Sequence, residues 1–137
     1  MGALANHIMS NIPKTDPLNF GIYDDNLDYK KVVSFLEFGT NELSKIGGVS
    51  KNSVRTDNKA PQALRDRLRE IAVICSLVAE YFNGNAVKTA LWFNTPNPMI
   101  GGMTPRDMIR SGRSDKLIKF IMEARAENEE EQAPKSE

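Results

Sequence analysis

The sequence predicts an all-α protein that folds as a compact helical bundle. Apolar residues recur at helical spacing along several segments, and capping residues or glycines bound most of those segments. No stretch sustains the alternation of apolar and polar residues that is typical of β-strands. The 137 residues suffice for one domain or for two small ones that share a core, and 40% hydrophobic residues can supply that core.

The N-terminal residues 1–27 are expected to form a flexible or extended lead, because they contain few consecutive apolar residues. The apolar side chains at 20–23 could pin this lead to the body as an extended segment. The first helix is expected from about Tyr29 to Phe38, where several apolar residues form a wide face. Asp28 is a plausible N-cap, and Gly39 ends the helix.

A helix-turn-helix is predicted within residues 28–82. Short helices are expected at Glu42–Gly47 and from Lys51 to about Asp57. The spacing of small, glycine, apolar and capping residues is typical of the motif, and it involves Ser44, Gly48, Val49, Ser50 and Val54. Ser44 must be small where the helices approach, and Ser50 caps the second helix. Compact helical proteins also use such a turn without binding DNA.

The exposed side chains around this turn are predicted to bind operator DNA, through base edges or phosphates. Residues 43–69 contain seven basic side chains and two acidic ones, which indicates a basic face. A homodimer would place two second helices in successive major grooves. The candidate DNA-binding residues are Lys45, Lys51, Asn52, Ser53 and Arg55.

The longest helix is predicted from Pro61 to Phe82. Its apolar positions alternate at spacings of four and three, at Leu64, Leu68, Ile71, Cys75, Val78 and Phe82. Such a seam could pair two chains as a coiled coil, but a central core helix is favoured for one this short. Its arginines, Arg65, Arg67 and Arg69, are expected mostly on a solvated face.

Residues 83–127 are expected to form a C-terminal helical domain. Helices are predicted at Ala86–Phe93, at Pro105–Arg110 and from Ser114 to about Glu127. The middle helix should begin with Thr104 as N-cap, followed by a proline at its first position. Residues 128–137 are polar and acidic, so they are expected to form a disordered tail.

The stretch between Trp92 and Gly112 combines residues that shape a loop. In order it contains Trp92, Thr95-Pro96-Asn97, Gly101-Gly102, Thr104-Pro105 and Gly112. This ordered set resembles the C-terminal domain of the Xre/MbcA/ParS antitoxin family, over about Ala86 to Ala124. The residues expected to maintain the shape of the motif are Trp92, Pro96, Gly101, Gly102, Pro105 and Gly112.

The resemblance implies that the C-terminal region binds a toxin. It also implies that the toxin is of the RES type, which consumes NAD, and that the antitoxin covers its NAD pocket. The prolines stiffen the loop, and apolar and cationic side chains near it could contact the toxin. The candidate toxin-binding residues are Asn97, Met99, Ile100, Arg113, Lys116 and Lys119. Alternatively, the methionines and Ile100 fill the core and the cations are merely solvated.

The sequence therefore leaves two candidate functions. One is an antitoxin of a type II system that also represses its own operon. The other is a stand-alone dimeric transcriptional regulator without a toxin partner. A neighbouring gene for a RES-type toxin would favour the first.

Catalysis is not expected, because no nucleophile has a recognisable base and no glycine-rich phosphate loop follows a strand. Cys75 and His7 are the only residues of their kinds, so no metal site, disulfide or cofactor is predicted. Cys75 should be a buried apolar residue. No signal peptide or membrane-spanning stretch is recognised, and a cytoplasmic location is expected.

Overall fold

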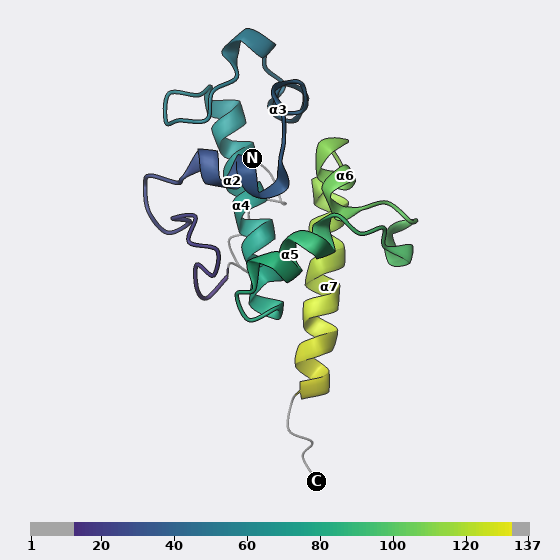
Figure 1. Cartoon of the computed structure of the whole chain (residues 1–137). Coiled ribbons are helices and arrows are strands. Elements are labelled where there is room, and N and C mark those ends of the chain that lie inside the picture. Colours follow the sequence, from purple (N-terminus) through teal and green to yellow (C-terminus); the bar gives the residue numbers. More distant parts are fainter. Residues whose placement is uncertain (1–12, 133–137) are drawn as a thin grey trace.

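The computed structural model describes residues 13–132, and within them it contains helices and no strand (Figure 1). This confirms the all-α class. The α-helices are α2 (Tyr29–Leu36), α3 (Thr40–Gly47), α4 (Gln62–Tyr81), α5 (Ala86–Phe93), α6 (Pro105–Arg110) and α7 (Ser114–Gln132). Two short 3-10 turns, η1 (Lys51–Ser53) and η2 (Pro98–Ile100), complete the described elements.

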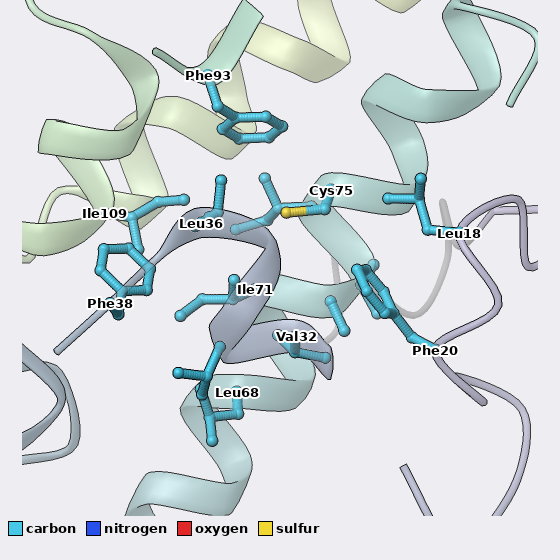
Figure 2. Packing of buried hydrophobic residues seen from close by; sticks show 14 of the residues in the cluster. Leu18, Phe20, Val32, Leu36, Phe38, Leu68, Ile71, Cys75, Phe93 and Ile109 are labelled. Atoms are coloured by element: carbon cyan, nitrogen blue, oxygen red, sulfur yellow. The ribbon is translucent and has the colours of Figure 1, made fainter. Parts of the chain in front are cut away.

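Helix α4 lies at the centre of the bundle, in contact with α2, α3, α5 and α7. Every side chain from Ile71 to Ala79 is buried, so α4 is surrounded along its C-terminal half. One hydrophobic cluster extends from Leu18 in the N-terminal segment to Ile121 in α7 (Figure 2). The prediction that this helix is a core helix is confirmed, and Cys75 is one of its buried apolar residues.

The segment that precedes α2 packs on the body through four buried side chains, Leu18, Phe20, Ile22 and Leu27. The Arg69 guanidinium on α4 donates to the backbone carbonyls of Ile22 (2.9 Å) and Asp24 (3.3 Å). Arg69 therefore fastens this segment to α4, and the expectation of a merely solvated side chain was wrong for it. Tyr23 is 53% exposed and is not one of these buried side chains. Residues 1–12 of the predicted lead lie outside the described residues.

The predicted second helix of the helix-turn-helix, from Lys51 to Asp57, does not form. Gly48 ends α3 in the left-handed conformation (φ 64°), but Lys51–Ser53 is one 3-10 turn. The Ser50 hydroxyl does not cap the turn and instead bonds the Ser53 hydroxyl at 2.8 Å. A short helix in water needs an apolar face to pack, and this segment offers only Val54.

The closest approach of α3 to α4 occurs at Gly47. A Cβ atom there would lie 3.0–3.2 Å from atoms of Leu64, including its Cα. The residue that must be small for this packing is therefore Gly47, whereas the Ser44 hydroxyl donates to the backbone carbonyl of Val49. The glycine thus permits close helix packing, although it is a poor helix former.

The C-terminal helices follow the predicted bounds for α5 and α6. Helix α7 continues to Gln132, past the predicted end at Glu127, so the first part of the expected disordered tail is helical. Alanine, glutamate and glutamine favour helix, which explains why α7 continues into this acidic sequence. Its last turns project beyond the rest of the bundle (Figure 1). Residues 133–137 lie outside the described residues.

Candidate functional site

The loop from Asn97 to Met103 is closed on itself by hydrogen bonds. The Asn97 backbone N–H donates to the Met103 carbonyl at 3.0 Å, and the Gly102 N–H donates to the Asn97 carbonyl at 2.9 Å. The Asn97 side chain accepts from the Met99 N–H at 2.9 Å. Gly101 and Gly102 have positive φ of 71° and 80°. Glycine adopts this conformation without strain, so the loop has a defined shape.

Helix α6 starts directly after this loop, and its start is as predicted. The Thr104 hydroxyl accepts from the Asp107 N–H at 3.0 Å, and Pro105 occupies the first helical position. Pro105, Met108 and Ile109 are buried, which anchors the helix in the core. Gly112 then turns the chain into α7 with φ of 81°. The loop is therefore held by a capped, buried helix on one side.

A groove of about 450 Å³ lies between this loop and α7. We call it the loop–α7 groove. Its lining consists of Met99, Ile100, Met103, Met108, Phe120, Arg113, Lys116, Lys119 and Glu123. Five of the six predicted toxin-binding residues thus line one groove, and the sixth, Asn97, instead holds the loop in shape.

The groove combines an apolar floor with a cationic rim. Met99 is 75% exposed, whereas Ile100 and Met103 pack partly against the core. Arg113 directly before α7 and Lys116 and Lys119 on it are exposed, and none of them forms an ion pair within the part of the chain that the structure describes. Met99 and the cations are therefore available to a partner. Ile100 and Met103 partly fill the core, as the alternative interpretation of the sequence expects. An apolar groove edged by cations suits a partner with an acidic rim.

A second groove, of about 530 Å³, lies where α4, α5 and α7 meet. We call it the aromatic groove, because Tyr81, Phe82, Trp92 and Phe120 contribute to its lining. The Trp92 ring is half-buried and meets the Phe93 ring edge-on, with 5.0 Å between centroids. Phe93, which is fully buried, is the core residue of this pair. The groove was not predicted, because its lining comes from three helices distant in sequence.

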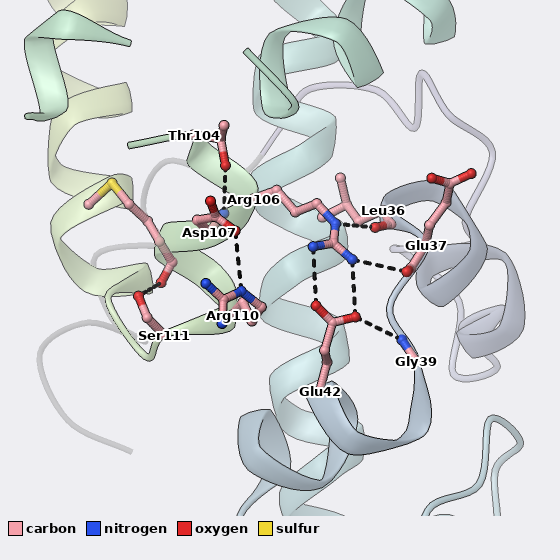
Figure 3. Close-up of polar contacts among 10 residues, drawn as sticks. Leu36, Glu37, Gly39, Glu42, Thr104, Arg106, Asp107, Arg110 and Ser111 are labelled. Carbon is pink, nitrogen blue, oxygen red and sulfur yellow. Dashed lines mark hydrogen bonds and ion pairs between the residues drawn. The ribbon is translucent and has the colours of Figure 1, made fainter. Parts of the chain in front are cut away.

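Arg106 joins α6 to the N-terminal helices. Its guanidinium donates to the carbonyls of Leu36 (2.6 Å) and Glu37 (3.0 Å), where α2 ends (Figure 3). It also bonds both carboxylate oxygens of Glu42 at 3.1 Å and lies 4.6 Å from the Phe38 ring centroid. Only 19% of its side chain is exposed. Sequence patterns could not identify this contact, because the partners become neighbours only in the folded chain.

Glu42 is the centre of this polar contact. Burial acts to raise the pKa of its carboxyl, but hydrogen bonds from the Gly39 N–H and from Arg106 outweigh burial. The charges of Arg106 and Arg110 act in the same direction, and the net result is a pKa below the ordinary value for glutamate. Glu42 is thus held ionised at neutral pH and fixes the start of α3 to α6.

The predicted DNA-binding residues lie around α3 and η1. Lys45 on α3 and Lys51 and Asn52 on η1 are exposed, and Ser53 is half-buried. The Arg55 guanidinium is paired with Asp57, with Nη2–Oδ2 at 2.6 Å and Nε–Oδ1 at 3.0 Å. Lys51, Asn52 and Ser53 therefore lie on a short turn and not on a helix that could enter a groove of DNA.

Burial raises the pKa of the Cys75 thiol, which therefore stays protonated and unreactive. Between Pro13 and Gln132 no three histidine, cysteine, aspartate or glutamate side chains gather closely enough to hold a metal ion. Within the same residues, no helix is long and apolar enough to cross a membrane.

The fold and the grooves together define a small helical binding domain, built around a rigid loop and the helix beside it. Comparison with known families identifies that domain. Residues 77–118 match the family described as "Antitoxin Xre/MbcA/ParS C-terminal toxin-binding domain". The match covers the C-terminal region and confirms the family predicted for it from the sequence, and toxin binding by an antitoxin is the role it supports. No curated protein and no solved structure matches the chain.

Proposed function

We propose that this protein is the antitoxin of a type II toxin–antitoxin system, and that it neutralises a RES-type, NAD-consuming toxin through the loop–α7 groove. The observation that carries this proposal is the convergence of Met99, Ile100, Arg113, Lys116 and Lys119 on one groove. Most of that groove lies within the matched toxin-binding domain. By covering the NAD pocket of the toxin, the antitoxin would keep the substrate out.

The groove is suited to protein recognition for two physical reasons. Its loop is closed by backbone hydrogen bonds, with Pro96 directly before it and Pro98 within it, so little conformational entropy is lost when a partner binds. Met99 offers an exposed and adaptable apolar contact beside three cations. The toxin surface that fits it is apolar at the centre and acidic at the rim.

Reversing two charges of the rim tests the site. Arg113→Glu combined with Lys116→Glu should leave the fold intact, because both side chains are exposed. Placing like charges at the contact should weaken toxin binding by several kcal/mol, or roughly a thousandfold or more. The measurement is growth of cells that express the cognate toxin, together with co-purification of the two proteins. Cells carrying the variant should stop growing.

The matched control is Lys30→Glu with Lys59→Glu, which changes the net charge equally at exposed positions away from the groove. Both variants are expressed from an inducible promoter at equal level. Rescue by the control and not by the rim variant supports the site. Equal rescue by both variants would show that the toxin contacts another surface. Absence of any toxin gene beside this gene would favour the stand-alone regulator.

We also propose that the antitoxin represses its own operon by binding DNA through the corner around α3 and η1. Lys45 and Lys51 are exposed there, and neither is ion-paired in residues 13–132. Because η1 is a single turn, phosphate contacts are favoured over reading of base edges.

Lys45→Ala with Lys51→Ala should weaken binding to the promoter and to random DNA alike. The slope of log affinity against log salt should fall by about 2, since two phosphate contacts are lost. Mobility-shift titrations at several salt concentrations measure both. A loss confined to the promoter would instead show that these residues read base sequence.

A further inference from the structure

The aromatic groove leaves apolar side chains open beside the C-terminal end of α4. Leu77 and Ile121 are buried in its floor, whereas Tyr81 at its edge is 62% exposed and Trp92 is half-buried. Covering such surface with other apolar groups is favourable, because it removes the surface from water. The groove is therefore suited to an apolar segment that lies along it.

The N-terminal segment is fastened beside this groove through Glu80. One carboxylate oxygen of Glu80 accepts from the backbone N–H groups of Lys14 (3.0 Å) and Thr15 (3.2 Å). The other oxygen lies 3.6 Å from the guanidinium of Arg125, which lines the groove, as does Tyr81 directly after Glu80. Since consecutive Cα atoms are about 3.8 Å apart, the chain that precedes Lys14 starts within reach of the groove.

Residues 1–12, which precede this attachment, carry apolar side chains at helical spacing. These side chains recur three and four positions apart, at Met1, Leu4, Ala5, Ile8, Met9 and Ile12. On a helix they would share one face, and Asn6 and Ser10 would lie on the opposite face. Pro13, directly after them, would end such a helix. The pattern is that of a short amphipathic helix.

We propose that residues 1–12 form an amphipathic helix that docks its apolar face into the aromatic groove of the same chain. At a rise of about 1.5 Å per residue, the eight positions from Leu4 to Ile12 span about 12 Å. The eight positions from Phe120 to Asn128, which are the first and last groove residues on α7, span the same length. The apolar face of the segment therefore matches the groove in length as well as in character.

The attachment at Glu80 favours this segment over any separate molecule. A segment that is joined to its own binding site is present there at a high effective concentration, which a second copy or another protein does not reach unaided. Only Pro13 separates Ile12 from the attached Lys14. Residues 1–12 also contain no lysine, arginine, aspartate or glutamate, so no charged side chain is desolvated when they dock.

The docked segment would also support the neighbouring groove. Phe120 lines both the aromatic groove and the loop–α7 groove. A helix packed on one side of Phe120 would hold the ring in place and leave the cations of the loop–α7 groove free. The inference goes beyond the proposed function and does not depend on it, because docking occurs in the free chain. Its failure would leave the proposed toxin site untouched.

Tryptophan fluorescence of the full chain tests the docking, because Trp92 is the only tryptophan and lines the groove. Leu4→Asp combined with Ile8→Asp places two charges on the apolar face and should release the segment. The emission should then shift to longer wavelength, and acrylamide should quench it more strongly, since water reaches the ring. The matched control is Asn6→Asp with Ser10→Asp, which adds the same charge on the opposite face and should change neither property.

Hydrogen exchange of the full chain, followed by mass spectrometry, reports on the segment itself. The backbone amides of residues 4–11 should be protected in the unmodified chain. Their exchange should become about tenfold faster or more in the apolar-face variant, because each buried Leu or Ile contributes about a factor of ten or more to docking. Their protection should be lower than that of α4, since the segment can open without unfolding the core. Circular dichroism checks that the helices of the body persist in both variants.

Exchange measured at several chain concentrations distinguishes the possible occupants of the groove. Protection that does not change with concentration supports docking within one chain. Protection that appears only at high concentration would place a second copy in the groove, and protection that appears only with added toxin would assign the groove to the toxin. Either result would overturn the inference. Unprotected amides at 4–11, or Trp92 emission that is indifferent to the apolar-face variant, would overturn it as well.

Discussion

Replacing Phe93 by alanine should lower the free energy of unfolding by about 3–5 kcal/mol, the range for truncating a fully buried aromatic ring. Phe93 has no exposed surface and lies in the core at the end of α5. The truncation removes apolar contacts and leaves a cavity that neighbouring helices cannot close without moving. Urea unfolding followed by circular dichroism measures the change as a shift of the midpoint at constant slope.

The matched comparison is the neighbouring Trp92→Ala. Trp92 is the larger ring, but it is half-buried in the wall of the aromatic groove. Its truncation widens an open groove that water can enter, so the cost should be about 1–3 kcal/mol. A Trp92 variant that loses more stability than the Phe93 variant would contradict this assignment and show that tryptophan is the core residue of the pair.

Arg106→Met should cost about 2–4 kcal/mol. Methionine retains much of the apolar stem but cannot bond the carbonyls of Leu36 and Glu37 or pair with Glu42. Removing one partner of a largely buried ion pair leaves the other without compensation. The control is Arg110→Ala, whose pair with Asp107 is about half exposed and should be worth at most about 1 kcal/mol.

The Arg106 effect should also depend on pH. The pKa of Glu42 is lower in the folded chain than in the unfolded chain, so its ionised form favours folding at neutral pH. That contribution is complete above the ordinary glutamate pKa and is lost as the pH falls through the lowered one. The stability difference between Arg106→Met and the unmodified protein should therefore shrink in acid. A difference that is constant with pH would show that the carbonyl contacts dominate.

Local patterns were sufficient for much of the fold. The bounds of α5 and α6 follow from a cap at each start, Asn85 and Thr104, and the positive φ of Gly101 and Gly102 follows from their setting between prolines and a helix cap. These features depend on bonds within a few residues. The residues that determine these features are therefore neighbours both in the sequence and in the folded chain.

The predicted recognition helix shows where local patterns mislead. Residues 51–57 have the spacing of a helix-turn-helix but lack an apolar face to pack, so they form one 3-10 turn. In the other direction, α7 continues through acidic residues that had suggested disorder, because their helix propensity is high. Composition alone could not weigh propensity against charge in that tail.

The sequence by itself determined the helical class, the central α4 seam, the shaped loop and the antitoxin family, because each depends on residues close together in the chain. Only the tertiary structure decided that Arg106 joins α6 to α2 and α3, and that Gly47 sets the distance between α3 and α4. It also gathered Met99, Arg113 and Lys119 around one groove. Such contacts join residues far apart in sequence, and their energies exist only once the core has packed.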